Sequence, residues 1–338
     1  LIMSQIKPKS KLTISSFFSG AGGLDLGFEK AGLDIVWANE FDKNIWSTFE
    51  HNFPKTKLDK RSMTDIDSND IPEADGFIGG PPCQSWSEAG ARRGEGDKRG
   101  QLFFEYVRVI KDKQPRFFLA ENVSGILHDL HSGSFQKLLE EFEKVGYNIF
   151  YELLNANDYD VPQDRKRVII IGYHKKKMKG KKFEFPKPSK KNFVLKDAIW
   201  DLRNNAEPAK EGNKTNGEKL KINNHEYMTG GFSTMYMSRN RVRSWDEPSF
   251  TIQAGGRHAP IHPEAPKMEL VGKDKRIFVP GKEKLYRRLS VRDCARIQTF
   301  PDSFIFKYNN IADGYKMIGN AVPVNLAYNV AKQILKDL

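Results

Sequence analysis

The sequence predicts an α/β protein with a doubly wound, Rossmann-like sheet and a second, smaller, irregular β-rich domain. Apolar and β-branched runs alternate with amphipathic stretches through the first half of the chain, as in strands joined by crossover helices. A glycine-rich turn follows the first apolar run and precedes a helical pattern. Beyond residue 183 the alternation stops, and Gly, Pro, Asn and Arg become frequent. We therefore expect the sheet in the first region and a separate unit in the second.

Length, charge and cysteine content limit the class of protein. The 338 residues are enough for one large and one smaller domain, and a formal net charge of +12 favours a polyanionic partner. Cys83 and Cys294 lie far apart and outside any CxxC spacing, which predicts neither a zinc site nor a disulfide framework. No apolar run reaches the length of a membrane span. We expect a reduced, cytoplasmic protein, with no metal and no membrane partner.

Strands are predicted from composition, and helices from apolar residues spaced at i, i+3 and i+4. Residues 11–18 (KLTISSFF) are β-branched and aromatic, and residues 24–31 follow at helical spacing. Near the C-terminus Ser290 is the expected N-cap of a helix. The other expected strands are 35–38, 63–66, 75–79, 117–120, 147–154 and 168–172; the other expected helices are 102–111, 135–145, 289–300, 324–335 and part of 42–60.

The turn after the first strand, Ser19-Gly20-Ala21-Gly22-Gly23, brings glycines to the N-terminus of a helix. Glycines there let a ligand approach the backbone, and Glu40, at the end of the second strand, can accept hydrogen bonds from ribose hydroxyls. The spacing is not a true GxGxxG motif. The pattern therefore favours an adenosine-bearing cofactor other than a dinucleotide. A nicotinamide-dependent oxidoreductase is the alternative that this turn alone would allow.

Cys83 follows a Gly79-Gly80-Pro81-Pro82 corner that ends a predicted strand. Prolines and glycines stop a helix from starting there, so the thiol is expected on a rigid loop beyond the C-terminal end of the strand. Open α/β sheets bind their ligands at this edge. The alternative is a buried structural cysteine beside a turn. Residues 85–100, rich in Gly and Arg, form either a mobile active-site loop or solvated surface.

Two basic segments lie in the second half of the chain. Residues 175–191 combine lysines with prolines and predict a linker or an electrostatic arm, with solvated surface as the alternative. Residues 238–245 (SRNRVRSW) carry arginines at alternating positions, which on a strand would share one face. Arginine paired with guanine O6 and N7 is the commonest specific base contact. A strand edge protected by charge is the alternative.

Five motifs of the chain, which occur in the family's order, closely resemble those of the DNA cytosine-C5 methyltransferases. The resemblance covers essentially the whole chain. It implies a Rossmann-like methyltransferase sheet over 11–182, completed by 308–338, and a target-recognition domain over 183–307. The motifs are Phe18-Ser19-Gly20-Ala21-Gly22-Gly23, Gly80-Pro81-Pro82-Cys83-Gln84, Glu121-Asn122-Val123, Gln163-Asp164-Arg165-Lys166-Arg167 and Gly319-Asn320-Ala321-Val322-Pro323.

The resemblance implies S-adenosylmethionine as the cofactor. The glycine turn would hold its methionine end and Glu40 its ribose. Phe41 would stack on the adenine, with Asp65 and Ile66 at the adenine edge. The implied cofactor-binding residues are Phe18, Gly20, Ala21, Gly22, Gly23, Leu24, Glu40, Phe41, Asp65, Ile66, Pro81, Leu102, Asn320 and Ala321.

The resemblance also implies the reaction. A Cys83 thiolate would add to C6 of a flipped-out cytosine, so that C5 becomes nucleophilic. Glu121 would supply a proton at N3, which requires a raised pKa. Arg165 would bind O2 and help to hold Glu121 and Cys83. The implied catalytic residues are Cys83, Glu121, Asn122, Arg165, Arg167 and Pro82.

The resemblance extends, through 238–245 and 285–300, to bacterial restriction-modification enzymes that methylate GGCC, with the inner cytosine as the expected target. It implies double-stranded DNA as the partner, a monomeric protein, and a cognate restriction endonuclease that acts on the same site without a stable complex. A transfer-RNA cytosine methyltransferase and a non-catalytic DNA-binding relative are the alternatives. The expected DNA-binding residues are Ser85, Arg92, Arg93, Arg239, Arg241, Arg243 and Arg257.

Overall fold

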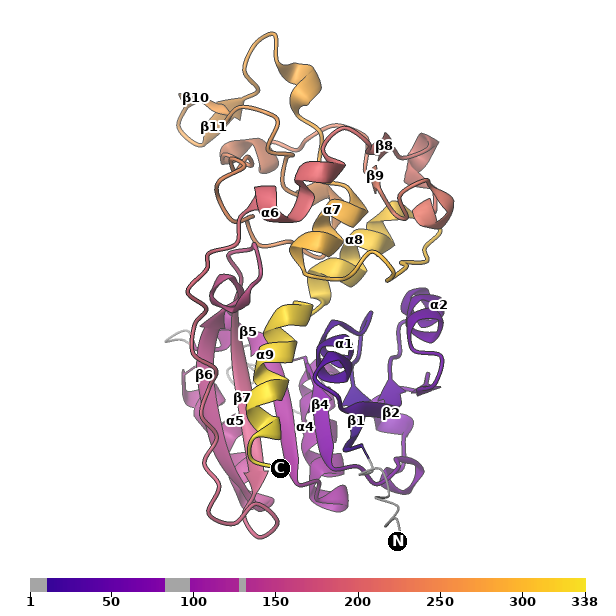
Figure 1. Ribbon diagram of the computed structural model, residues 1–338, viewed down its shortest axis with the longest axis vertical. Helices are drawn as coiled ribbons and strands as arrows, with labels where there is room; N and C mark the ends of the chain where they lie inside the picture. Colours follow the sequence, from indigo (N-terminus) through magenta and orange to yellow (C-terminus); the bar gives the residue numbers. More distant parts are fainter. Residues whose placement is uncertain (1–10, 83–97, 128–131) are drawn as a thin grey trace, which may run out of the picture.

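The computed structural model describes residues 11–82, 98–127 and 132–338, called the described residues below (Figure 1). Its main sheet has the strand order β3-β2-β1-β4-β5-β7-β6. The strands from β3 to β5 run parallel, whereas β7 is antiparallel to both β5 and β6. The strands are β1 Thr13–Phe17, β2 Asp34–Asn39, β3 Lys57–Asp59, β4 Gly76–Gly79, β5 Phe117–Val123, β6 Tyr147–Asn155 and β7 Lys166–His174.

Helices cover both faces of this sheet, as expected for a doubly wound fold. Successive side chains of a strand point to opposite faces, so Phe117 and Phe118 enter different cores. Phe117 packs in the core that α1 and α9 cover, and Phe118 packs in the core that α4 and α5 cover. The helices are α1 Gly23–Lys30, α2 Lys43–Asn52, α4 Lys98–Lys113, α5 Ser132–Lys144, α6 Leu195–Ile199, α7 Val291–Ile297, α8 Ile311–Asn320 and α9 Val324–Leu335.

The strand predicted at 63–66 is wrong. The third strand lies earlier, at β3, where it pairs with β2, and Met63–Asp65 form a turn of 3-10 helix. The Ser62 side chain accepts a hydrogen bond from the Thr64 amide at 3.4 Å. Such local side-chain capping competes with strand pairing. The turn carries the chain from the sheet edge back into the core at Ile66.

The part of the chain from α6 to α8 forms the smaller β-rich region seen above the sheet in Figure 1. It contains short strands joined by loops and 3-10 turns, and a core of its own around Tyr236, Val242 and Ile261. The prediction of a strand that presents Arg239, Arg241 and Arg243 on one face is wrong, because only Val242 forms a bridge there, with Ile261. The short strands are β8 Glu207–Pro208, β9 Glu226–Tyr227, β10 Glu269–Gly272 and β11 Lys275–Ile277.

Helix α8 was not predicted, although its last residues belong to a recognised motif. Its buried residues Ile311, Tyr315 and Ile318 stand at helical spacing, and it packs against α7 and against the 3-10 turn at Gly256–His258. The next helix, α9, packs instead along α1 on the sheet (Figure 1). The segment from 308 to 338 therefore contacts both regions, and the domain boundaries at 182 and 307 stay predictions.

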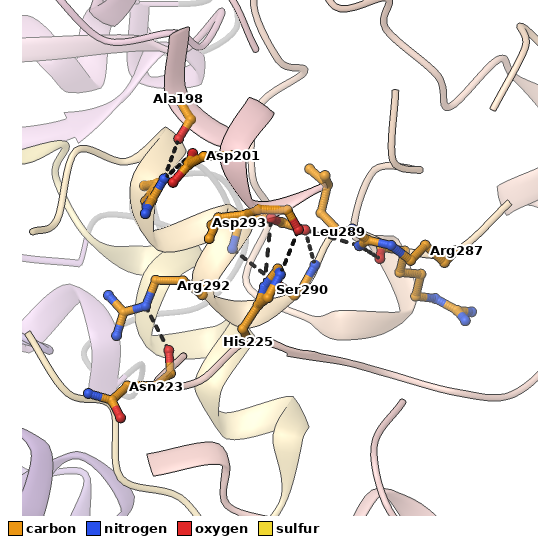
Figure 2. Close-up of polar contacts among 12 residues, drawn as sticks. Ala198, Asp201, Asn223, His225, Arg287, Leu289, Ser290, Arg292 and Asp293 are labelled. Atoms are coloured by element: carbon orange, nitrogen blue, oxygen red, sulfur yellow. Dashed lines mark hydrogen bonds and ion pairs between the residues drawn. The ribbon is translucent and has the colours of Figure 1, made fainter. Parts of the chain in front are cut away.

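Helix α7 begins at the Ser290 N-cap that the sequence predicted, and Asp293 completes a capping box. The Ser290 hydroxyl accepts from the Asp293 amide at 2.9 Å, and the Asp293 carboxylate accepts from the Ser290 amide at 2.9 Å. Buried His225 joins this cap, with Nδ1 2.8 Å from the Ser290 hydroxyl and Nε2 2.9 Å from the Leu202 carbonyl (Figure 2). Because a carbonyl can only accept, Nε2 carries the proton and Nδ1 accepts from Ser290. Burial lowers the His225 pKa, which keeps the ring neutral.

Substituting Ser290→Ala removes the cap and leaves Nδ1 of His225 buried without its donor. We expect the free energy of unfolding to fall by about 1–3 kcal/mol, measured by urea denaturation. Ser303→Ala, at an exposed position, is the matched control and should change stability by less than about 0.5 kcal/mol. Equal effects of the two substitutions would show that the cap contributes nothing.

Candidate functional site

A cavity of about 480 Å³ lies at the C-terminal ends of β1, β2, β4 and β5. This volume is in the range of small-molecule sites. Its walls also include the end of α8 and the chain that follows it. Many of the predicted site residues line it, namely Phe18, Gly20, Gly23, Leu24, Glu40, Phe41, Pro81, Pro82, Leu102, Glu121, Asn122, Asn320 and Ala321.

The glycine turn gives the cavity an open floor. Gly20 has a φ of +57°, which a glycine adopts without strain, and a side chain there would point into open space. Gly22 has a φ of +94°, and a Cβ on it would lie 2.3 Å from the Phe53 ring. Gly22 and Ala21 thus shape the turn from behind the cavity wall. The turn leaves backbone groups of Gly20 and Gly23 accessible to a ligand at the N-terminus of α1.

Glu40 fixes the turn to the end of β2. Its carboxylate accepts from the Gly20 amide at 2.8 Å and from the Asp42 amide at 2.7 Å. Burial raises the Glu40 pKa, and these hydrogen bonds oppose the rise. Beside it Phe41 is 69% exposed and lines the cavity, so its ring is available for stacking. The arrangement suits a ligand with hydroxyls and a planar ring.

Asp65 and Ile66 are not among the residues that line the cavity, and their role at the adenine edge stays a prediction. Asp65 is exposed, and Ile66 is packed in the core between the sheet and α4. Ser62 and Met63 line it instead. The cause is the unpredicted turn at Met63–Asp65, which moves the chain past the cavity three residues earlier than expected.

Asp25 is a cavity residue that the sequence analysis missed. It lies in the first turn of α1 and is fully buried, and its carboxylate oxygens have no hydrogen-bond partner among the described residues. Burial raises the Asp25 pKa to about 7. The signal available in the sequence was an acidic residue directly after Gly22-Gly23-Leu24, where a helix N-terminus favours negative charge. A buried carboxylate without a partner suits a cationic ligand.

Glu121 lines the cavity and is paired with Arg167 behind it. Its Oε1 lies 2.9 Å from Nε of Arg167, and both side chains are largely buried. Burial raises the Glu121 pKa, while Arg167 and then Arg165 lower it. A Cβ on Gly80 would lie 3.2 Å from Oε2 of Glu121, so glycine lets the 79–82 corner approach the carboxyl group. The adjacent Asn122 donates to the Pro81 carbonyl at 3.1 Å and ties the corner to β5.

The role predicted for Arg165 is wrong in one respect, since Arg167 and not Arg165 pairs with Glu121. The Arg165 side chain is 1% exposed and its guanidinium donates to the carbonyls of Ile252, Gly319 and Ala321. Burial lowers its pKa to about 9. In a strand, residues 165 and 167 share a face, so the sequence pattern could not distinguish them.

Cys83, Ser85, Arg92 and Arg93 lie outside the described residues. Pro82, which precedes Cys83 in the chain, lines the cavity. The placement of the predicted nucleophile therefore stays a prediction.

Four of the six arginines expected to bind DNA lie within the described residues, and their surroundings differ. Arg241 donates to the Tyr236 carbonyl at 2.8 Å, and its guanidinium lies over the Tyr236 ring. Arg243 pairs with Asp164 at 3.2 Å and with Glu247 at 3.5 Å. Arg239 and Arg257 are exposed and form no ion pair within the described part of the chain. The two exposed guanidiniums are therefore accessible to a polyanion.

Residues 11–82, 98–127 and 132–338 contain no group of three or more His, Cys, Asp or Glu side chains placed to hold a metal ion. None of the helices within these ranges combines the length and the hydropathy that a membrane span requires.

The geometry agrees with comparisons to known proteins. A model of the family of C-5 cytosine-specific DNA methylases matches residues 12–336. The chain is 60% identical over 327 residues to the type II methyltransferase M.MthTI of Methanothermobacter thermautotrophicus, covering 97% of this chain and 98% of the relative. It is 56% identical over 329 residues to the type II methyltransferase M.FnuDI of Fusobacterium nucleatum, covering 97% and 95%.

A solved structure shows the same fold. The Entamoeba histolytica methyltransferase EhMeth superposes with a TM-score of 0.70 at 16% identity, covering 97% of this chain and 99% of that one. The family match spans nearly the whole chain and contains every element that lines the cavity. The chain therefore belongs to the family of C-5 cytosine-specific DNA methylases and is a DNA cytosine-5 methyltransferase.

Proposed function

We propose that this enzyme transfers a methyl group from S-adenosylmethionine to C5 of a cytosine flipped out of double-stranded DNA, through a covalent bond from Cys83 to C6. One observation carries the proposal most strongly. Glu121, which is paired with Arg167, lies on the wall of a cavity that the Pro81-Pro82 corner also lines, and that corner leads directly to Cys83. A proton donor, a cation and the residue before the thiol are thus supplied to one site.

The cavity fits the cofactor by shape and charge. S-adenosylmethionine carries an adenine, a ribose and two cationic groups, and it supplies a methyl group bonded to a positively charged sulfur. The exposed ring of Phe41 would stack on the adenine, and the Glu40 carboxylate would accept from the ribose. The buried Asp25 carboxylate supplies negative charge at the glycine turn. Leu102 and Asn320 would close the sides of the pocket.

Cofactor binding can be tested at Phe41. Substituting Phe41→Ala removes the stacking surface, and we expect affinity for S-adenosylhomocysteine to fall about tenfold, as measured by calorimetry. Phe41→Trp should retain the affinity. Leu270→Ala, at another exposed apolar residue, is the matched control and should not change it. Unchanged affinity in Phe41→Ala would exclude stacking on this ring.

The chemistry follows from the reluctance of cytosine C5 to act as a nucleophile. Addition of the Cys83 thiolate to C6 breaks the C5–C6 double bond and places electron density on C5, which then takes the methyl group. Loss of the C5 proton and expulsion of the thiolate restore the double bond. The base must leave the helix for this, at a cost of a few kcal/mol. The rigid prolines before Cys83 would hold the thiol at one side of the base.

Glu121 would balance the charge that develops on the ring. As the thiolate adds, N3 becomes more basic, and a protonated Glu121 can donate to it. Burial favours the protonated form by raising the Glu121 pKa. Arg167 holds the carboxyl group and would donate to O2, the contact first expected of Arg165. Asn122 would keep the corner in register with β5.

The central test compares the native protein with Cys83→Ala. Each is incubated with methyl-labelled S-adenosylmethionine and with duplex DNA or transfer RNA, and label in the nucleic acid is counted. We expect label in DNA only and none with Cys83→Ala. A duplex with 5-fluorocytosine at the target should trap the native protein as a covalent complex, because fluorine cannot leave as the C5 proton does. Label in RNA alone, or undiminished label with Cys83→Ala, would refute the proposal.

The pH profile tests the pairing of Glu121 with Arg167. A step that needs protonated Glu121 slows as pH rises through its pKa, and Arg167 lowers that pKa. Arg167→Met should therefore move the alkaline limb of single-turnover methyl transfer to higher pH and reduce the maximal rate about 100-fold. Lys166→Met, at the exposed neighbour on β7, should leave both unchanged. An unmoved limb in Arg167→Met would mean that another group controls it.

We propose GGCC as the recognition sequence, with methylation of the inner cytosine, in a restriction-modification system. The closely matching relatives are type II methyltransferases, which supports this setting. The exposed Arg239 and Arg257 are the side chains best placed to pair with guanines, whereas Arg241 and Arg243 already bind protein groups. We further propose a monomer in the cytoplasm, whose cognate endonuclease acts on the same site without a stable complex.

Guanine readout is tested by combining substitution with base change. Arg257→Ala should weaken binding to a GGCC duplex by about 1–3 kcal/mol, and so should inosine at the guanine it reads. If the two groups are partners, the combined loss will be smaller than the sum of the single losses. Strict additivity at every guanine position would rule Arg257 out as a base reader. Arg239→Ala is tested in the same way.

A further inference from the structure

A buried polar joint connects the target-recognition region to the cofactor cavity. It consists of Gln163, Arg165 and Gln298, whose side chains are 0%, 1% and 0% exposed. Gln163 lies just before β7, and Gln298 is the C-cap of α7. The side-chain amide of Gln163 donates to Oε1 of Gln298 at 2.7 Å. Polar side chains from two distant parts of the chain thus meet away from solvent.

On one side, the joint holds Ile252 by both of its backbone groups. The Ile252 amide donates to Oε1 of Gln163 at 2.9 Å, and Nη1 of Arg165 donates to the Ile252 carbonyl at 2.9 Å. Five residues further along the chain is Arg257, the exposed guanidinium proposed to read guanine. The joint therefore fixes the start of the segment 252–257 that presents this arginine.

On the other side, the joint holds the end of α8. Nη2 of Arg165 donates to the Gly319 carbonyl at 2.7 Å and to the Ala321 carbonyl at 3.1 Å. The side-chain amide of Gln298 donates to the Ile318 carbonyl at 2.8 Å and to the Ala321 carbonyl at 3.2 Å. Asn320, between these bonded carbonyls, lines the cofactor cavity together with Ala321. A shift of this helix end would change the shape of the cavity.

The segment 252–257 and helix α8 also touch directly, without space for a side chain. A Cβ on Gly319 would lie 2.3 Å from the carbonyl carbon and oxygen of Gln253 and 2.5 Å from the Ala254 nitrogen. A Cβ on Gly256 would lie 2.7 Å from the Tyr315 ring of the same helix. Packed interfaces of this kind move as units rather than by continuous deformation.

We propose that Arg165 is a positioning residue that couples DNA binding to cofactor binding. Its guanidinium is shared by the recognition segment and by the helix end at the cofactor cavity, so a DNA-induced adjustment at 252–257 is transmitted to Asn320. Coupling of this kind is reciprocal, so cofactor binding strengthens DNA binding by the same factor. The inference rests on the proposed function, because it assigns DNA to one side of the joint and the cofactor to the other.

The test measures coupling, which loss of stability alone does not remove. Affinity for S-adenosylhomocysteine is determined by calorimetry with and without a short duplex that the native protein methylates. We expect the duplex to tighten binding at least about fivefold in the native protein. In Arg165→Lys the factor should fall to near one, since an ammonium on a flexible stem cannot hold three carbonyls in the geometry of a planar guanidinium.

Arg292→Lys is the matched control. Arg292 is also fully buried and also donates to backbone carbonyls, those of Asn223, Pro301 and Phe304, but it makes none of the contacts to α8 (Figure 2 shows the bond to Asn223). The same chemical change there should lower the melting temperature and leave the coupling factor intact. Equal loss of coupling in both variants would reduce Arg165 to a general stabilising role and overturn the inference.

A milder variant guards against failure of Arg165→Lys to fold. Gln163→Met keeps the volume of the side chain and removes the hydrogen bonds to Ile252 and Gln298, and it should lower the coupling factor in part. Coupling that persists in Gln163→Met and Arg165→Lys, or that is absent from the native protein, would refute this inference and leave the proposed function standing. Failure of the native protein to bind S-adenosylhomocysteine or to methylate any duplex would instead refute the proposed function.

Discussion

The site depends on one constraint, which is that β1, β2, β4 and β5 run parallel and end at the same edge of the sheet. Gly20, Glu40, Pro81 and Glu121 each follow or end one of these strands, and all four line one cavity. The hydrogen-bond register brings the strand ends to a common level. Residues separated by up to a hundred positions in the chain become neighbours because parallel pairing leaves them no other arrangement.

Because β7 runs in the reverse direction, it brings the cation Arg167 to this edge of the sheet. Because β7 is antiparallel to β5, its beginning lies beside the end of β5, and Arg167 is opposite Val123. Glu121, two residues earlier on β5, is a diagonal neighbour of Arg167 on the same face. This register explains the ion pair at 2.9 Å. A strand that ran parallel would have placed its first residues at the opposite end of the sheet.

Burial gives the charged groups of the site their chemical character. Burial raises the pKa of Glu121 and brings the pKa of Asp25 to about 7, whereas an exposed carboxylate would be fully ionised at neutral pH. The same burial makes Arg165 dependent on the carbonyls around it. The proposed reaction and the proposed coupling thus use groups whose burial restricts their protonation state and their choice of hydrogen-bond partner.

The sequence by itself determined the fold class, the family and most of the cavity wall, because strand alternation and glycine corners are local properties that a short segment specifies. Only the tertiary structure decided which of Arg165 and Arg167 meets Glu121, since the two stand two residues apart in one motif and only Arg167 belongs to the part of β7 that pairs with β5. The burial of Asp25 was hidden for the same reason, because it depends on packing between segments far apart in the chain. The turn at Met63–Asp65 has a local cause instead, since the Ser62 side chain caps it, and its composition alone resembles that of a strand.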